Sequence, residues 1–362
     1  PGETMPYKIS FMLQRTQASG QSEGGDNNGG IAIVSAECRG LIEAVETIST
    51  SLPFILDFSR TLMFVFSHEL ASQEGVIEEL MSVSFPRLRI RYNALVSISL
   101  SSAADVFEGL KTDIEPNLSK IHKNYLLYSK ASGLVPLMNV MALHEAVNER
   151  YADALLMVCG VTGKDSSSAP PVLVETDDYA YIGGSMLIES DMKASLAGSA
   201  VFRGSRMIGI LDGQQTQLML MVRGNYTEGR IRLKDTGEQG INVFVIAKGK
   251  PRFSLMLEPK PVASVTIPLR AYIEQPEDIS EEEINEAAPR LEAQLEEELT
   301  ELFYACRANG SDVMGFGRYA VKRFSKQETW RDYDWYAAYA MLEATFMVEI
   351  DMDRTADKSV LE

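Results

Sequence analysis

The sequence predicts an α+β (mixed α/β) fold of three domains, in which mixed sheets are flanked by helices. Three observations predict this class. Segments with strand and helix character alternate through the first 150 residues in the order β-β-α-β-α-β-α. Short apolar runs separated by glycine turns follow at residues 192–220. The last quarter combines a long amphipathic acidic helix with one regularly alternating strand.

The first 150 residues are predicted to form an N-terminal mixed α/β domain. Two strands, at residues 7–14 and 31–36, are joined by a glycine-rich loop at residues 17–30. Hydrophobic periodicity then predicts helices at 40–51, 69–81, 101–110, 121–129 and 134–149, and strands at 61–67 and 88–100.

Residues 151–240 are predicted to form a small, hairpin-rich middle domain. A strand at residues 153–160 precedes the Ser/Pro-rich break GKDSSSAPP. Short strands are then expected at KASLAGSAVF, MIGIL and LMLMV, and glycines lie between them. No internal repeat is apparent.

Residues 241–362 are predicted to form the C-terminal domain. Strands are expected at 241–247 and 262–273, a second helix near 319–324 and a closing strand at 344–353. The main element is a long acidic helix at residues 280–308. Ser280 and Glu283 match a capping box at its start, and Gly310 suits its end. Pro289 lacks a backbone donor and predicts a kink or break.

Composition excludes several classes of protein. The chain has 362 residues and a net charge of −17, and no apolar run approaches the ~20 residues that span a bilayer. No basic cluster offers the footprint that nucleic acid requires. Residues 274–301 hold twelve acidic side chains and one base, which favours a solvated helix face over a docking surface. Cys38, Cys159 and Cys306 are too sparse for a disulfide framework.

Catalytic and ligand-binding motifs are not apparent in the sequence, so we predict no catalytic, metal or cofactor site. His68, His122 and His144 lack zinc-site spacing, and the first and last of them are expected to be helix-end or surface histidines. Neighbouring His-Glu pairs are expected to point to different helix faces. Asp351 and Asp353 share a strand face, where a solvated strand end is favoured over a cation site. Neither a nucleophile elbow nor a phosphate loop occurs.

The strongest candidate site is the segment Asp312-Val-Met-Gly-Phe-Gly317 together with Trp335. Gly315 and Gly317 permit tight or left-handed backbone geometry, while Phe316 can fill the core. These residues are interpreted either as a structural motif, which we favour, or as a contact with a partner subunit. A cluster of aromatic residues nearby suits a core cap or an interface anchor equally well: Trp330, Tyr333, Trp335, Tyr336 and Tyr339.

Several segments, in this order, resemble the Ger(x)C family, the C subunits of nutrient germinant receptors in spore-forming bacteria. The resemblance covers most of the chain. It is carried by the segments ECRGLIEA at 37–44, SHELASQEGV at 67–76, GSAVFR at 198–203, MIGIL at 207–211 and DVMGFG at 312–317, and by Trp335.

The resemblance implies three domains of unusual mixed folds, attached by an N-terminal lipidated cysteine to the outer face of the spore inner membrane. The implied partners are the membrane-embedded A and B subunits. No catalytic activity is implied. The sequence departs from the family because neither a lipobox cysteine nor the Trp/Asp/Arg-containing opening stands at its start. Lipidation, at a cysteine outside this chain, is therefore an expectation that rests on the resemblance alone.

The favoured function is therefore that of a non-catalytic receptor subunit that binds or scaffolds the membrane-embedded subunits. Two alternatives from other classes stay open. The protein could capture a small germinant itself, in which case ligand binding would raise its melting temperature. Less favoured is a hydrolase of cell-wall material, which would need a carboxylate pair in a cleft. The sequence does not identify the germinant or the docking surface.

Overall fold

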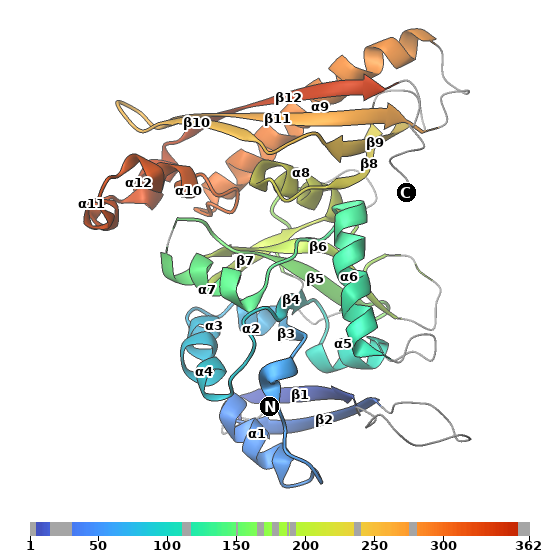
Figure 1. The fold of residues 1–362 in the computed structure, drawn as a ribbon, viewed down its shortest axis with the longest axis vertical. Coiled ribbons are helices and arrows are strands. Elements are labelled where there is room, and N and C mark those ends of the chain that lie inside the picture. Colours follow the sequence, from blue (N-terminus) through green and yellow to red (C-terminus); the bar gives the residue numbers. More distant parts are fainter. Residues whose placement is uncertain are drawn as a thin grey trace.

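In the computed structural model the described residues form three β-sheets, arranged along the long axis of the molecule from the N-terminal to the C-terminal part (Figure 1). The structure describes residues 5–14, 31–110, 117–149, 151–164, 170–175, 181–186, 188, 193–234, 240–274 and 281–353. The glycine-rich loop predicted at 17–30, the Ser280 cap and most of the Ser/Pro-rich break at 163–171 lie outside these residues.

A two-stranded antiparallel hairpin occupies the N-terminal end of the molecule. Its strands are β1 (Tyr7–Gln14) and β2 (Ile31–Cys38), paired in register from Tyr7 with Cys38 to Gln14 with Ile31. Helix α1 (Leu41–Ser49) follows and contacts β2. Most residues of β1 are only partly buried. The hairpin therefore does not form a closed core with the central sheet along its whole length.

A five-stranded mixed sheet forms the centre of the molecule. Its order is β3 (Met63–Ser67), β4 (Leu95–Ser99), β5 (Leu155–Val161), β6 (Ala194–Arg203) and β7 (Arg206–Leu211). The first three strands are parallel, whereas β6 and β7 add antiparallel. Every residue of β4 and β5 is buried, as expected for strands covered on both faces.

Helices cover both faces of the central sheet, as the mixed fold class predicted. On one side, α7 and the short helices that follow β3 share a core with the sheet. On the other side lie α5 and α6. These elements are η1 (Phe58–Arg60), α2 (His68–Ala71), α3 (Val76–Glu79), η2 (Leu80–Ser84), α4 (Phe85–Arg87), α5 (Ala103–Leu110), α6 (Leu118–Ser132) and α7 (Val140–Glu149).

The third sheet contains five strands and has one covered face. Its strands are β8 (Glu228–Leu233), β9 (Ile241–Ala247), β10 (Arg252–Met256), β11 (Val262–Ile273) and β12 (Glu343–Asp353). β12 runs parallel to β11, and β9 and β10 are antiparallel to it. Burial alternates along β8, β11 and β12, so one face is packed and the other faces solvent.

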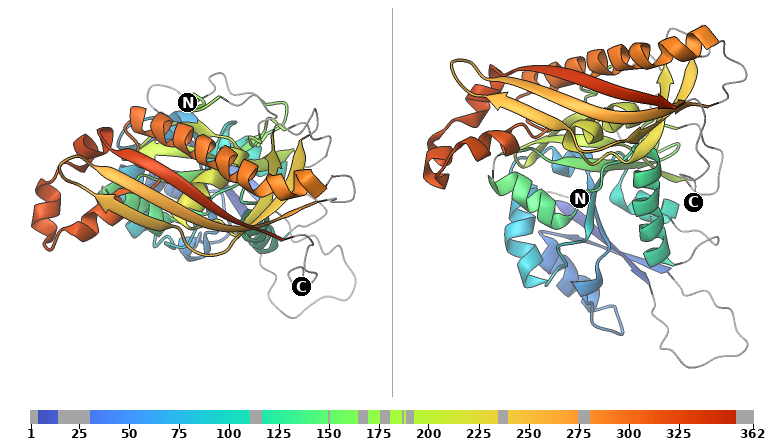
Figure 2. Two further views of the ribbon diagram at one scale, coloured as in Figure 1. Left: turned by 90° about the horizontal axis from the view of Figure 1, so that it is seen from above. Right: turned by 45° about the horizontal axis from the view of Figure 1, so that its top comes forward.

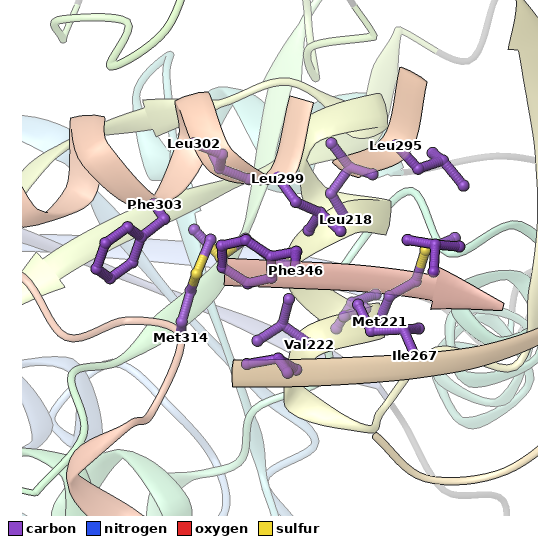
Figure 3. Packing of buried hydrophobic residues seen from close by; sticks show 14 of the residues in the cluster. Leu218, Met221, Val222, Ile267, Leu295, Leu299, Leu302, Phe303, Met314 and Phe346 are labelled. Carbon is purple, nitrogen blue, oxygen red and sulfur yellow. The ribbon is translucent and has the colours of Figure 1, made fainter. Parts of the chain in front are cut away.

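Two helices cover the packed face of the third sheet (Figures 1 and 2). They are α8 (Gly213–Arg223) and the long acidic helix α9 (Glu281–Ala308). Leu218 and Met221 of α8 lie beside Leu299 of α9 and Phe346 of β12 in one continuous core (Figure 3). Short helices follow α9, namely α10 (Gly317–Ala320), η4 (Val321–Arg323), α11 (Gln327–Asp332) and α12 (Trp335–Ala340).

The strand predicted at residues 218–222 is part of helix α8 instead, so this prediction was wrong. Asp212 and Gln215 form a capping box, and Gly224 ends α8 in a left-handed conformation with φ 69°. Nearly all of α8 is buried between the central and third sheets, and residues 218–222 in its second half form a continuous apolar run that is buried throughout. Such a helix lacks the amphipathic period by which helices are recognised and reads as a buried strand.

Several further elements differ from their predicted bounds. The helix predicted at 134–149 begins only at Val140, as α7. The helix predicted at 69–81 is interrupted, because Gly75 adopts φ 81° between α2 and α3. The strand predicted at 88–100 is ordered as β4 only from Leu95, since Arg89 has a left-handed φ of 55° in a preceding turn. By contrast, α9 runs through Pro289 without the predicted break.

The three sheets do not follow the predicted domain bounds at every point. β4 precedes residue 150 and pairs with β5, which follows it. β8 precedes residue 240 and pairs with β9, which follows it. Parallel strands need long crossover connections, so β4 and β5 are distant in sequence and a linear scan assigns them to different units. The bounds at 150 and 240 therefore divide two sheets, and the division into three domains stays a prediction.

Candidate functional site: a buried aspartate junction

The end of α9 directs Asp312 into the protein interior. Gly310 adopts φ 68°, its N–H donates to the Arg307 carbonyl at 2.9 Å, and the Ser311 N–H donates to the Cys306 carbonyl at 3.0 Å. This pair of bonds is a Schellman motif, which satisfies the last carbonyls of the helix and reverses the chain. Gly310 therefore ends the helix as its sequence position predicted, and Asp312 follows with 0% exposure.

The Asp312 carboxylate accepts hydrogen bonds from three consecutive backbone N–H groups and one indole. Oδ1 accepts from the N–H groups of Gly315 at 3.0 Å and Phe316 at 2.8 Å. Oδ2 accepts from Gly317 N–H at 2.7 Å and from Trp335 Nε1 at 2.9 Å. All five residues named from the sequence are therefore brought together around one carboxylate.

Gly315 and Gly317 have separate reasons to be glycine. Gly315 has a left-handed φ of 85°. A Cβ on Gly317 would lie 2.5 Å from the Tyr151 carbonyl oxygen and 2.7 Å from Trp335 Nε1. The first constraint is conformational and the second is steric. Together they let the backbone close tightly around Asp312.

Phe316 and Trp335 anchor this turn in the C-terminal core. The Phe316 ring packs edge-on against Phe253 at 5.6 Å and Phe303 at 5.4 Å. Trp335 is 3% exposed and lies 5.9 Å from the ring of Tyr339, which is fully buried. These contacts are those of a structural role. The alternative role as a partner contact stays a prediction, since none of the five residues lies at the surface of this structure.

A second buried carboxylate, Asp153, links the turn to the central sheet. Its Oδ2 accepts from the Asp312 N–H at 2.7 Å, and its own N–H donates to the Asp312 carbonyl at 3.1 Å. Oδ1 accepts from Gly204 N–H at 2.7 Å and from the Tyr336 hydroxyl at 3.0 Å. Asp153 precedes β5, and Gly204 lies in the turn between β6 and β7. We call these two carboxylates and their donors the aspartate junction.

The guanidinium of Arg223, at the end of α8, completes the aspartate junction. Nη1 donates to the carbonyl oxygens of Val313 and Asp153, the second at 3.3 Å. Burial lowers the pKa of Arg223 to about 10, an effect that the nearby Arg318 reinforces and the two aspartates oppose. The junction therefore joins the end of α8, the start of β5 and the turn after α9.

Burial also shifts the acids of the junction. The pKa of Asp312 is raised to about 7 by burial and by the Asp153 carboxylate, against the lowering effect of its N–H donors. Burial raises the pKa of Asp153 as well. These shifts resemble those of catalytic acids, yet every oxygen of the pair already accepts a hydrogen bond from the protein. The arrangement is suited to holding three elements together.

Sequence reasoning found one half of the junction and missed the other. Asp153 was read only as the start of a strand, and Arg223 and Gly204 were not named as site residues. A signal was present, because Asp153 lies between Ala152 and Ala154 at the start of a wholly apolar strand. An acid in that position must find donors when it is buried.

Other residues considered from the sequence lie apart from the junction. His68 lies at a helix end, as one of the two predicted alternatives has it, although it is only 4% exposed and not a surface residue. Its Nε2 lies 3.1 Å from Glu69 Oε1, so the prediction that the two side chains point to different helix faces was wrong. At the first turn of a four-residue helix the glutamate can fold back onto its neighbour. Asp351 bonds Lys248 at 2.9 Å, and Asp353 lies 3.4 Å from Arg270. Within the described residues, no group of three potential ligands could hold a metal.

Comparisons with known proteins define the class to which this fold belongs. Residues 1–161 match the model described as "Spore germination protein N-terminal domain", and residues 197–356 match "Spore germination B3/ GerAC like, C-terminal". The structure is similar to the crystal structure of the GerBC protein, with a TM-score of 0.59 and 14% identity over 96% of this chain and 93% of that one. A search of curated proteins found no match.

The two family models together account for most of the chain, and they lie in the order expected for a spore germination protein. The chain therefore belongs to the Ger(x)C family, the C subunits of spore germinant receptors. The mixed α+β fold implied by the resemblance is confirmed by the structure and by its similarity to GerBC. In the described part of the chain, none of the helices has the length and apolar character needed to cross a bilayer.

Proposed function

We propose that this protein acts as a non-catalytic subunit of a nutrient germinant receptor, binding or scaffolding the membrane-embedded A and B subunits at the spore inner membrane. The observation that carries the proposal is the match of both halves of the chain to models of spore germination proteins. A lipid anchor on a cysteine outside this chain would hold the domains at the outer face of that membrane.

The chemistry of the aspartate junction supports a binding role over a catalytic one. A glycoside hydrolase needs two carboxyl groups flanking a cleft, one of them free to donate a proton. Asp153 and Asp312 are both 0% exposed and bind backbone N–H groups. The hydrolase alternative predicts that the purified protein degrades cortex peptidoglycan in a zymogram, whereas the receptor-subunit proposal predicts no cleared zone.

Direct capture of a germinant is the second alternative, and one cavity bears on it. A cavity of about 2090 Å³ lies beside β1 and β3, well above the ~300–1,000 Å³ usual for small ligands. Its lining is apolar near Phe64, Leu80 and Phe85, but it also includes polar side chains such as Asp105 and Tyr125. A thermal-shift screen with amino acids and sugars distinguishes the two functions, since a bound germinant should raise the melting temperature.

Deletion of the protein tests the receptor-subunit proposal in spores. Spores that lack it should lose their response to the nutrient while still germinating with calcium dipicolinate. Complementation with the wild-type chain should restore the nutrient response. A normal nutrient response in the deletion strain, with no second copy of the gene to compensate, would contradict the proposal.

A further inference from the structure

The cavity of about 2090 Å³ lies between the N-terminal hairpin and the central sheet. In Figure 1 the hairpin β1–β2 is found at the lower end of the molecule, next to the sheet edge formed by β3. Protein interiors are packed as densely as organic crystals, with few voids larger than a water molecule. This cavity is open to solvent and is lined more by apolar than by polar atoms, so a space of its size is a place for an occupant.

The cavity runs along the edges of two strands. Every residue of β1, from Tyr7 to Gln14, and every residue of β3, from Met63 to Ser67, lines it. Side chains alternate between faces along a strand, so a cavity over one face would be lined by every second residue. Within the described residues β1 pairs with β2 alone and β3 with β4 alone, which leaves one edge of each strand open.

The walls on both faces of the β3 edge are apolar. On one face, Phe64 stacks on Phe85 at a centroid distance of 4.6 Å, next to Leu80. On the other face, Val65 and Leu110 pack against the small core beneath α5. A strand added to this edge would therefore meet apolar side chains on both of its faces, as the buried strands β4 and β5 do.

The charged side chains that line the cavity are of both signs, and most of them, such as Lys8, Arg60, Asp57 and Glu69, are exposed at its margin. Asp105 is half-buried, but it is already paired with Lys164. The inner part of the cavity thus has no net charge to complement, and an occupant with a charged centre would be buried without a partner. Charge complementarity therefore selects an uncharged segment whose ends are polar or charged.

An exposed apolar loop extends the cavity surface outward. Phe54 is 53% exposed and Ile55 is 94% exposed, and both belong to the cavity lining. The loop connects α1 to η1. Large apolar side chains continuous with an open strand edge are the features of a surface that another polypeptide covers.

We propose that this cavity receives an extended segment of a partner polypeptide in the receptor complex, which adds a strand to the open edge of β3. A lipid or a small apolar compound could fill the volume but would leave the edge N–H and C=O groups unpaired, whereas a strand pairs them. The matching segment is a run of about five uncharged, apolar and β-branched residues, the length of β3. This inference rests on the proposed function for the identity of the partner.

A soluble peptide tests the proposal on the whole protein. The probe has a core of five alternating valines and isoleucines between pairs of lysines, and two control peptides have the same sequence with alternate core amides N-methylated. The unmodified peptide should bind and slow hydrogen exchange at the β3 amides at least tenfold. At least one of the methylated peptides should bind at least tenfold more weakly, because it lacks the donors that pair with the edge.

Two surface variants show whether the binding occurs at the predicted place. Ile55→Ser should weaken peptide binding several-fold, because Ile55 lines the cavity and is solvent-exposed in the free protein. Leu127→Ser is the matched control, since Leu127 is 55% exposed on α6 and is not part of the lining. Both variants should fold normally, as both side chains are at the surface.

Several outcomes would overturn the inference. These are no binding by any peptide, equal binding by all three peptides, protection that excludes β3, and dimerisation of the protein through the same edge. None of these results would bear on co-isolation of the protein with the A and B subunits. The inference and the proposed function can therefore fail separately.

Discussion

At the scale of single residues, Asp312 is the central acceptor of the aspartate junction. Its carboxylate binds the N–H groups of Gly315, Phe316 and Gly317 and the indole of Trp335, and its backbone bonds Asp153 in both directions. Burying a polar group costs free energy unless the group is hydrogen-bonded. Removing a buried acceptor has a similar cost, because its former donors are left unpaired. The junction should therefore be sensitive to any change at this position.

Replacing Asp312 by alanine should strongly destabilise the protein. The change removes the acceptor of four buried donors, each of which costs roughly 1–3 kcal/mol when left unpaired, with some compensation by water. We expect a loss of about 3–5 kcal/mol in the free energy of unfolding, measured by denaturant titration at neutral pH. The control Asp351→Ala removes an exposed ion pair with Lys248 and should leave the midpoint nearly unchanged. Equal effects of the two substitutions would contradict this assignment.

The raised pKa of Asp312 also predicts a dependence of stability on pH. The folded carboxyl has a pKa of about 7, against 3.8 for the ordinary group. Between these values the folded state keeps a proton that the unfolded chain has released, so stability should fall as pH rises from about 4 to about 7. Buried Asp153 contributes in the same direction.

The variant Asp312→Asn isolates this effect, because the amide does not titrate. Melting temperatures of the wild type and the variant should be compared from pH 4 to pH 8. From pH 4 to about pH 7 the wild type should lose stability relative to the variant. Above pH 7 the difference in melting temperature between the two should stay constant. A wild-type advantage that grows with pH would mean that the N–H donors outweigh burial.

Sequence reasoning was informative about Asp312 and its neighbours but not about Asp153. The turn residues lie within six positions of one another and their glycines have a local conformational explanation. The bond between Asp312 and Asp153 joins residues 159 positions apart. The local sequence pattern does not indicate which distant residue a buried acid will bind. The pairing of Asp153 with Asp312 therefore follows only from the fold.

At the scale of elements, helix α9 protects the free edge of the third sheet. β12 is paired with β11 on one side. On the other side the Val348 N–H donates to Glu296 Oε1 at 2.9 Å, and the Ile350 N–H donates to Glu292 Oε1 at 2.7 Å. Two glutamates of the acidic run are thus neither simply solvated nor available for docking. They pair backbone donors that would otherwise offer an edge to another chain.

The double variant Glu292→Ala/Glu296→Ala should therefore expose the β12 edge. We expect concentration-dependent self-association in sedimentation or light scattering, because unpaired strand edges pair with one another. Glu297→Ala/Glu301→Ala is the matched control, since it removes the same charge from exposed positions of the same helix. If both variants self-associated to the same extent, the loss of charge alone would explain the association.

Elements were predicted accurately where the sequence pattern alone determines them, and poorly where their burial depends on distant parts of the chain. β9 and β11 have the predicted bounds, and β12 begins one residue early, because half-buried strands show their period in the sequence. The helix α8 was predicted as a strand because it is buried on all sides. Its burial depends on two sheets that are assembled from distant parts of the chain.

At the scale of the whole molecule, α8 and the aspartate junction connect the central sheet to the third sheet. α8 contacts β6, α9 and β11, and Asp153 joins the start of β5 to the turn after α9. The hairpin β1–β2, by contrast, borders an open cavity. The molecule thus combines a well-packed C-terminal part with an incompletely packed N-terminal end, where we place the contact with a partner.

The most direct test of the central claim, that this protein works by binding receptor subunits, is co-isolation from detergent-solubilised spore membranes. A tagged, functional copy of the protein should retain the A and B subunits, and a copy destabilised by Asp312→Ala should retain neither, whereas Asp351→Ala should behave as the wild type. Recovery of the wild-type protein free of both subunits, from spores that respond normally to nutrients, would contradict the account.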